Sequence, residues 1–170
     1  MTPAIVLAAG ASTRMGRPKA LLQAGDRTFI RAILDTLRDA GIPDAVVVVR
    51  KGDAAVLGEV AAAGFGRIVT NLRASEGQLS SLIAGLDAID GPAIDAALVT
   101  LVDVPSITSA TVRVLLARAA VSGAPILRAV HQGRVIRRAM LTLKLQSPES
   151  LRRCRKWHPA FALPPIIGDA

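Results

Sequence analysis

Short uninterrupted apolar runs alternate along the chain with segments whose apolar residues recur at helical spacing. An apolar run of four to eight residues is typical of a strand buried on both faces of a sheet, whereas recurrence at every third or fourth position is typical of an amphipathic helix. The pattern therefore predicts strands over residues 4–9, 45–49, 67–70, 96–102 and 125–130, and helices over about residues 29–37, 54–63, 80–89 and 108–121.

This alternation predicts an α/β fold in which a mostly parallel sheet carries helices on both faces. In such sheets, ligands bind beyond the carboxyl ends of the strands, near the point where the strand order reverses. Three segments that follow predicted strands are therefore the places where we expect a site: residues 10–19, 71–81 and 103–105.

The size and composition indicate one globular domain. Of the 170 residues, 51% are hydrophobic and 20% are charged, and the mean hydropathy is +0.44, unlike the composition of disordered proteins. Aromatic residues make up only 2%, which disfavours a surface that stacks nucleic-acid bases. The chain has one cysteine, Cys154, and no uninterrupted apolar run of about 18 residues. We therefore expect a cytoplasmic protein without a membrane partner.

The net charge of +8 is concentrated near the C-terminal end. Residues 1–130 contain 13 Lys and Arg against 11 Asp and Glu, whereas residues 131–170 contain 8 against 2. The nearly neutral body argues against a nucleic-acid partner. Regular patterns also give way to Arg pairs and prolines, so we predict a domain over residues 1–134 and an atypical basic segment over residues 135–170.

The segment after the first predicted strand contains residue types that favour phosphate binding. Residues 10–19 match neither the G-x-G-x-x-G dinucleotide spacing nor the P-loop spacing. A turn that contains Gly10 can nevertheless direct backbone N–H groups toward an anion, and Arg14 and Lys19 add cationic side chains. An ordinary strand-to-helix turn with solvated cations is the alternative that these residues alone leave open.

Two further candidates follow other predicted strands. Asp103 comes directly after the strand over residues 96–102. A carboxylate there suits Mg²⁺, which takes one or two protein carboxylates and completes its shell with water and phosphate oxygens; a turn aspartate is the alternative. Gly77, Ser80 and Ser81 lie at a predicted helix start, where N-capping accounts for one of the two serines.

Three motifs occur in order along the chain. Residues 7–22 match L-A-A-G-x-S-x-R-M-G-x-x-K-x-L-L, residues 77–86 match G-x-x-x-S-L-x-x-G-L, and residues 103–105 match D-x-P. Together they resemble the MobA/MocA-like NTP transferase family, which includes molybdenum-cofactor cytidylyl- and guanylyltransferases. The resemblance covers roughly residues 3–130 and is strongest to the cytidylyl branch. It implies a three-layer, Rossmann-like nucleotidyltransferase fold.

The resemblance also implies an activity. CMP would pass from CTP, or another nucleotide from its NTP, to a phosphate-bearing acceptor such as molybdopterin, with release of pyrophosphate. The acceptor phosphate is already an anionic nucleophile, so no general base is required; residues 1–130 contain no histidine. The implied catalytic residues are Arg14, Lys19 and Asp103, with Asp103 holding Mg²⁺, and the implied nucleotide-binding residues are Leu7, Ala8, Ala9, Gly10, Ser12, Arg14, Lys19, Ser80 and Ser81.

The family pattern breaks after about residue 134. Where the family has a G-H-P-type element on the acceptor side, this chain has Val135-Ile136-Arg137-Arg138. The codons GTC-ATC-CGN for the first three of these residues contain CAT-CCG, which encodes His-Pro in another frame. We therefore hypothesise that the chain is frameshifted from about residue 135, a hypothesis that the coding DNA can test; a variant tail and a tail that binds RNA or acidic lipid are the alternatives.

The break also leaves alternatives for the function. One is another small-molecule or sugar-phosphate nucleotidyltransferase on the same scaffold, since fold alone does not set the acceptor. Another is a nucleotide-binding protein with impaired transfer, because the acceptor side departs from the family pattern.

Overall fold

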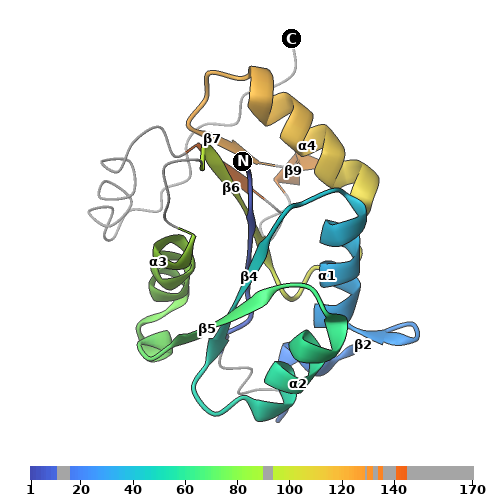
Figure 1. Ribbon diagram of the computed structural model, residues 1–170, viewed down its shortest axis with the longest axis vertical. Coiled ribbons are helices and arrows are strands. Elements are labelled where there is room, and N and C mark those ends of the chain that lie inside the picture. Colours follow the sequence, from blue (N-terminus) through green and yellow to red (C-terminus); the bar gives the residue numbers. More distant parts are fainter. Residues whose placement is uncertain (11–15, 90–93, 129, 132–133, 136–140, 145–170) are drawn as a thin grey trace.

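The computed structural model describes residues 1–10, 16–89, 94–128, 130–131, 134–135 and 141–144. Its centre is a six-stranded sheet with the strand order β5-β4-β1-β6-β10-β7 (Figure 1). The strands of this sheet are β1 (Ala4–Leu7), β4 (Ala45–Arg50), β5 (Arg67–Asn71), β6 (Ala96–Leu101), β7 (Ile126–Arg128) and β10 (Leu141–Lys144).

Four α-helices and several short elements connect the strands. The helices are α1 (Phe29–Asp39), α2 (Ala54–Ala63), α3 (Gln78–Ala88) and α4 (Ser109–Val121). The short elements are the 3₁₀ helices η1 (Lys19–Leu21) and η2 (Ala74–Glu76), the hairpin of β2 (Gln23–Ala24) with β3 (Arg27–Thr28), and the hairpin of β8 (Val130–His131) with β9 (Arg134–Val135). Among the described residues, no helix is long and apolar enough to cross a bilayer.

The parallel part of the sheet confirms the fold expected from the alternating pattern. β1 lies between β4 and β6 and is parallel to both, and β5 continues the sheet beyond β4. The chain thus builds outward from β1 through β4 to β5 and then returns to the other side of β1 to form β6. The strand order therefore reverses between β1 and β6, which is where such sheets bind ligands.

Helices cover both faces of the sheet, so the molecule has three layers (Figure 1). Alternate residues of β4 enter different cores, because successive side chains of a strand point to opposite faces. Val47 and Val49 pack in a core with α1, α2 and α4, whereas Val46 and Val48 pack in a core with α3. All four valines are at most 1% exposed, which explains why the β4 sequence is apolar without alternation.

β10 was not predicted from the sequence pattern. It lies between β6 and β7 and is antiparallel to both. The other strands of the sheet run in one direction, so the sheet is mostly parallel. The sequence of β10, Leu-Thr-Leu-Lys, lacks the uninterrupted apolar run that identified β1, β4 and β6, and its partners are distant in sequence. Part of the segment that we expected to be atypical thus completes the central sheet.

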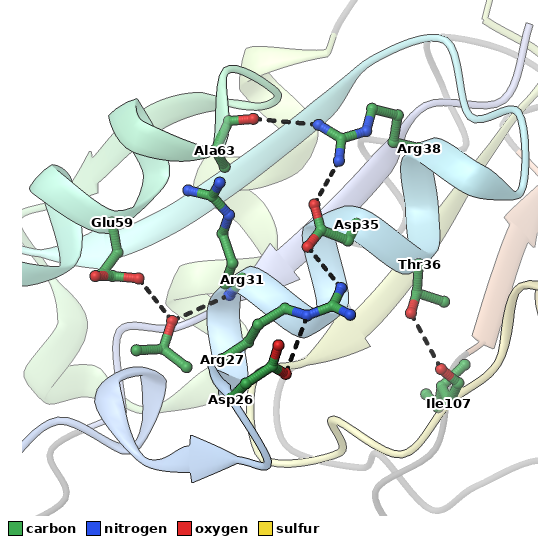
Figure 2. A network of polar contacts seen from close by, with 10 residues as sticks. Asp26, Arg27, Arg31, Asp35, Thr36, Arg38, Glu59, Ala63 and Ile107 are labelled. Carbon is green, nitrogen blue, oxygen red and sulfur yellow. Dashed lines mark hydrogen bonds and ion pairs between the residues drawn. The ribbon is translucent and has the colours of Figure 1, made fainter.

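A polar network joins the β2–β3 hairpin to α1 and α2 (Figure 2). Asp35 of α1 accepts hydrogen bonds from Arg27 of the hairpin, at 3.0 Å, and from Arg38 of its own helix. Thr28 caps α1 and donates to Glu59 of α2 at 2.7 Å. Because the hairpin directly follows η1, these contacts also hold in place the short helix that begins at Lys19.

Candidate functional site

A cavity of about 650 Å³ lies at the carboxyl ends of β1 and β6, beside the start of α3. This is the reversal point of the strand order, and the volume is typical of a small-molecule site. The first predicted strand extended to Ala9, but β1 ends at Leu7, and the next residues form part of the cavity wall. The cavity is lined by Leu7, Ala8, Ala9, Gly10, Lys19, Ala74, Ser75, Gly77, Gln78, Ser81, Leu101, Val102 and Asp103.

A cation and an anion meet in the wall of this cavity. Lys19 begins η1 and Asp103 follows β6, and Lys19 Nζ lies 3.2 Å from Asp103 Oδ2 although the residues are 84 positions apart. The Lys19 side chain is 35% exposed and the Asp103 side chain is 17% exposed, so solvent or a ligand can reach both. An ammonium group can bind a phosphate, and a carboxylate can hold a metal cation.

The donor set at Asp103 suits a metal that is shared with a phosphorylated ligand. Within the described parts of the chain, no group of three or more His, Cys, Asp or Glu side chains could hold a metal by itself. A single carboxylate beside an open cavity is nevertheless enough for Mg²⁺, because phosphate oxygens and water can supply its other ligands. The residues present therefore fit such an ion.

The connection from β5 to α3, which contributes Ala74, Ser75 and Gly77 to the cavity wall, is organised by Asn71. Its side chain is 5% exposed, its carbonyl accepts from the Arg73 backbone N–H at 2.8 Å, and its amide donates to Ser80 Oγ at 2.9 Å and to Ser81 Oγ at 3.0 Å. Asn71 was not predicted as a site residue. The signal in the sequence was its position directly after the strand predicted over residues 67–70, as the first residue of the segment 71–81.

A surface ion pair supports the same connection. The Arg73 guanidinium donates to both carboxylate oxygens of Glu76, at 2.7 and 2.6 Å. This hydrogen bonding holds the pKa of the Glu76 carboxyl below its ordinary value. The paired form is therefore kept at neutral pH and is lost only when acid protonates Glu76.

The start of α3 differs from the sequence-based expectation. α3 begins at Gln78, and its N-cap residue is Gly77, at φ 98°, with no side-chain cap. N-capping by Ser80 or Ser81 was therefore wrong, because both serines lie inside the first turn. Ser80 Oγ lies 2.7 Å from the carbonyl oxygen of Arg73 and 2.8 Å from that of Gly77. Its hydroxyl hydrogen is therefore donated to the backbone of the β5–α3 connection.

α3 reaches the cavity because it lies directly on the sheet. A Cβ atom at Gly85 would come within 2.5 Å of Ile5 Cγ2 and 3.1 Å of Val48 Cγ2. Only glycine fits this approach without displacing buried side chains of β1 and β4. The glycine thereby sets the distance between the sheet and the turn that carries Ser81.

The structure brings together most of the residues predicted for the site. The cavity wall contains Leu7, Ala8, Ala9, Gly10, Lys19, Ser81 and Asp103. Ser80 does not line the cavity and instead packs within the β5–α3 connection. The predicted residues Ser12 and Arg14 lie outside the described residues. Ser75 and Gln78 line the cavity but were not predicted.

Comparison with protein families gives a match to the MobA-like NTP transferase domain over residues 4–167. Comparison with the curated proteins gives no match. Among solved structures, Rv0371c of Mycobacterium tuberculosis H37Rv is similar over 93% of this chain and 78% of that chain, with 24% identity and a TM-score of 0.73. Its complex with manganese gives a TM-score of 0.68 at the same identity and coverage.

Two further solved structures share the fold. A CMP:2-keto-3-deoxy-manno-octonic acid synthetase complexed with CTP covers 94% of this chain and 79% of its own, with 15% identity and a TM-score of 0.69. Molybdopterin-guanine dinucleotide biosynthesis protein A from Archaeoglobus fulgidus covers 89% and 72%, with 16% identity and a TM-score of 0.63. These likenesses confirm a nucleotidyltransferase-type, Rossmann-like α/β fold.

Proposed function

The chain belongs to the MobA-like NTP transferase family, and from this premise we propose that it transfers CMP from CTP to a phosphate-bearing acceptor, with molybdopterin as the first candidate. One observation carries the proposal. A single cavity at the reversal point joins the Lys19–Asp103 pair to the turn after β1 and to the start of α3. A cytoplasmic location, expected from the sequence, is part of the same proposal.

The cavity has room for a nucleotide. Its volume of about 650 Å³ lies within the range of small-molecule sites, and its wall contains both the Lys19–Asp103 pair and the start of α3. The triphosphate would then lie at the Lys19–Asp103 end, the base beside α3, and the ribose along the turn at residues 8–10.

Transfer would require little covalent chemistry from the protein. An oxygen of the acceptor phosphate forms a bond to the α-phosphorus of CTP, the bond from that phosphorus to the bridging oxygen of the β-phosphate breaks, and pyrophosphate leaves. The protein contributes by holding the two substrates in line and by neutralising charge that develops on the leaving group. Lys19 can supply part of this charge, and Arg14 is the second cation that we propose for the phosphates.

Asp103 is the residue that would hold Mg²⁺. When bound, the ion would neutralise the triphosphate and polarise its phosphorus–oxygen bonds. The manganese complex of Rv0371c supports a divalent cation in this fold, and the choice of Mg²⁺ belongs to the proposal. Lys19 lies beside this carboxylate, with its Nζ 3.2 Å from Asp103 Oδ2.

A second candidate function uses the same nucleotide with another acceptor. It is favoured by the CTP complex of the CMP:2-keto-3-deoxy-manno-octonic acid synthetase, which shares the fold. Nucleotide binding with impaired transfer is a third candidate, since Val135-Ile136-Arg137-Arg138 stands where the family resemblance led us to expect a G-H-P-type element.

The test is calorimetric titration of the chain with CTP and GTP in the presence of Mg²⁺, followed by a pyrophosphate-release assay with molybdopterin. Binding of CTP with pyrophosphate release supports the proposal. If CTP binds but pyrophosphate is released only when a sugar phosphate or sugar acid replaces molybdopterin, the second candidate is favoured. Binding without release favours the third, and no binding of either nucleotide contradicts all three.

A further inference from the structure

The contact between Lys19 and Asp103 joins two groups to which the proposed function gives different ligands. Lys19 Nζ lies 3.2 Å from Asp103 Oδ2, and both residues line the cavity. In the proposed function, Lys19 binds the triphosphate and Asp103 holds the divalent cation. In the chain by itself, the ammonium and the carboxylate are instead ion-pair partners of each other.

The Lys19 ammonium and a divalent cation compete for the same carboxylate. A cation such as Mg²⁺ binds carboxylate oxygens at about 2.1 Å, so a cation on Asp103 would lie close to the ammonium unless Lys19 moves away. The two positive charges repel each other. Since the Asp103 side chain is only 17% exposed, solvent screens this repulsion less than it does at an open surface. A cation that arrives alone must therefore displace Lys19 and brings it no new partner.

A triphosphate without its metal meets the converse obstacle. Its negative charge attracts Lys19 but is repelled by the Asp103 carboxylate, which lies in the wall of the same cavity. The free nucleotide must draw Lys19 away from Asp103 and then lies beside a negative charge that Lys19 had neutralised. The ion pair therefore opposes each of the two ligands when it arrives without the other.

The complex of the metal with the triphosphate meets neither obstacle. Its cation takes the place of Lys19 at the carboxylate, and its phosphates take the place of Asp103 at the ammonium, so both charges exchange partners together. The exchange requires one side chain that can move. The Lys19 ammonium is carried by a flexible four-carbon chain, and the side chain is 35% exposed.

We propose that the Lys19–Asp103 ion pair makes the site select the metal–triphosphate complex over the metal alone and over the metal-free nucleotide. The inference rests on the proposed function and concerns the regulation of that same site. It predicts that loss of either residue strengthens the binding of one separate ligand. If the two residues served only to bind their own ligands, loss of either would leave the binding of the other ligand unchanged.

The first experiment measures the binding of the metal alone, with Mn²⁺ as the probe and the electron paramagnetic resonance signal of the free ion as the readout. It compares the full chain with Lys19→Met, which keeps an unbranched side chain but removes the charge. We expect the Kd for Mn²⁺ to fall about tenfold in Lys19→Met, because a repelling charge has been removed from beside the carboxylate. An unchanged or higher Kd in a folded Lys19→Met protein overturns the inference.

Two further variants show whether this gain comes from Asp103. Lys19→Met/Asp103→Asn should lose the gain, because the carboxylate that binds the ion is gone. Lys51→Met is the matched control for net charge, since Lys51 is exposed and does not line the cavity, and it should leave the Kd for Mn²⁺ unchanged. A gain that persists in the double variant, or that appears equally in Lys51→Met, also overturns the inference.

The second experiment measures CTP binding by calorimetry in the presence of EDTA. Asp103→Asn is nearly isosteric and removes the negative charge, so its Kd for metal-free CTP should be about tenfold lower than that of the full chain. With Mg²⁺ the order should reverse, because the variant has lost the carboxylate that holds the ion. Asp39→Asn is the matched control, because Asp39 is exposed and does not line the cavity.

The inference requires both gains, so the absence of either one overturns it. If the full chain binds CTP with Mg²⁺ but the variants show no gain, the inference fails and the proposed function stands. If the full chain binds no nucleotide with or without Mg²⁺, the proposed function fails. The Mn²⁺ comparison then still measures whether Lys19 opposes a cation at Asp103, so the two failures are distinct.

Discussion

At the scale of single residues, the proposed metal ligand Asp103 offers the most direct test of the proposed chemistry. Asp103→Ala removes the carboxylate that would hold Mg²⁺, but no apolar core volume. We expect Mg²⁺-dependent pyrophosphate release to fall about 100-fold or more. The free energy of unfolding should change by less than about 1 kcal/mol, because the ion pair with Lys19 is partly exposed. If pyrophosphate release by Asp103→Ala depended on Mg²⁺ in the same way as release by the unmodified chain, Asp103 would not be the metal ligand.

Lys19 is predicted to act on the triphosphate rather than on the nucleoside. Lys19→Ala should weaken CTP binding by about 10- to 100-fold, the usual effect of losing a charged hydrogen bond, and leave cytidine binding nearly unchanged. Calorimetry with both ligands measures the difference. Lys51→Ala is the matched control, because Lys51 is exposed and does not line the cavity. An equal effect on CTP in the two variants would show that Lys19 acts only through net charge.

At the scale of elements, the position of α3 depends on Gly85. Gly85→Ala places a methyl group 2.5 Å from Ile5 Cγ2, so α3 must move away from β1 and β4. We expect a loss of about 1–3 kcal/mol in the free energy of unfolding, as is usual for overpacked cores, together with weaker CTP binding. Urea unfolding and calorimetry on the same preparation measure both effects.

A second glycine provides the control for this helix. Gly58 lies within α2 and is exposed, and among the described residues a Cβ atom at this position would have no packing neighbour within 4 Å. Gly58→Ala should therefore stabilise the chain by about 0.5–1 kcal/mol through helix propensity. If Gly85→Ala also stabilised the chain, the glycine would not be needed for the close approach of α3 to the sheet.

At the scale of the whole molecule, β10 makes the C-terminal segment part of the fold. A chain that ends at residue 134 loses β10, which exposes the edge of β6 and breaks the connection of β7 to the sheet. Exposed edges promote association with other chains. We expect the 1–134 chain to unfold at lower urea concentration than the full chain and to aggregate.

A chain that ends at residue 144 separates the contribution of β10 from that of residues 145–170. It keeps β10 and should unfold close to the full chain, as urea titration and light scattering can show. A 1–134 chain that is as stable and monomeric as the 1–144 chain would indicate that β10 contributes nothing to the sheet.

The local features of this protein could be read from the sequence. Strand and helix periodicity depends on neighbours within a few residues, so the buried runs at β1, β4 and β6 and the amphipathic α1 were predictable. The alternation of these elements also predicted a parallel sheet and the sheet edge at which the cavity lies. The ordered motifs at residues 7–22, 77–86 and 103–105 indicated the family that the comparison confirms.

Contacts between distant parts of the chain decided the remaining features. The 3.2 Å approach of Lys19 to Asp103, the choice of Ser81 over Ser80 as a cavity residue, and the buried role of Asn71 all depend on how α3 and η1 pack on the sheet. The insertion of β10 depends on two partner strands at once. Periodicity carries no information about such pairings, because their energies arise only when the chain is already packed.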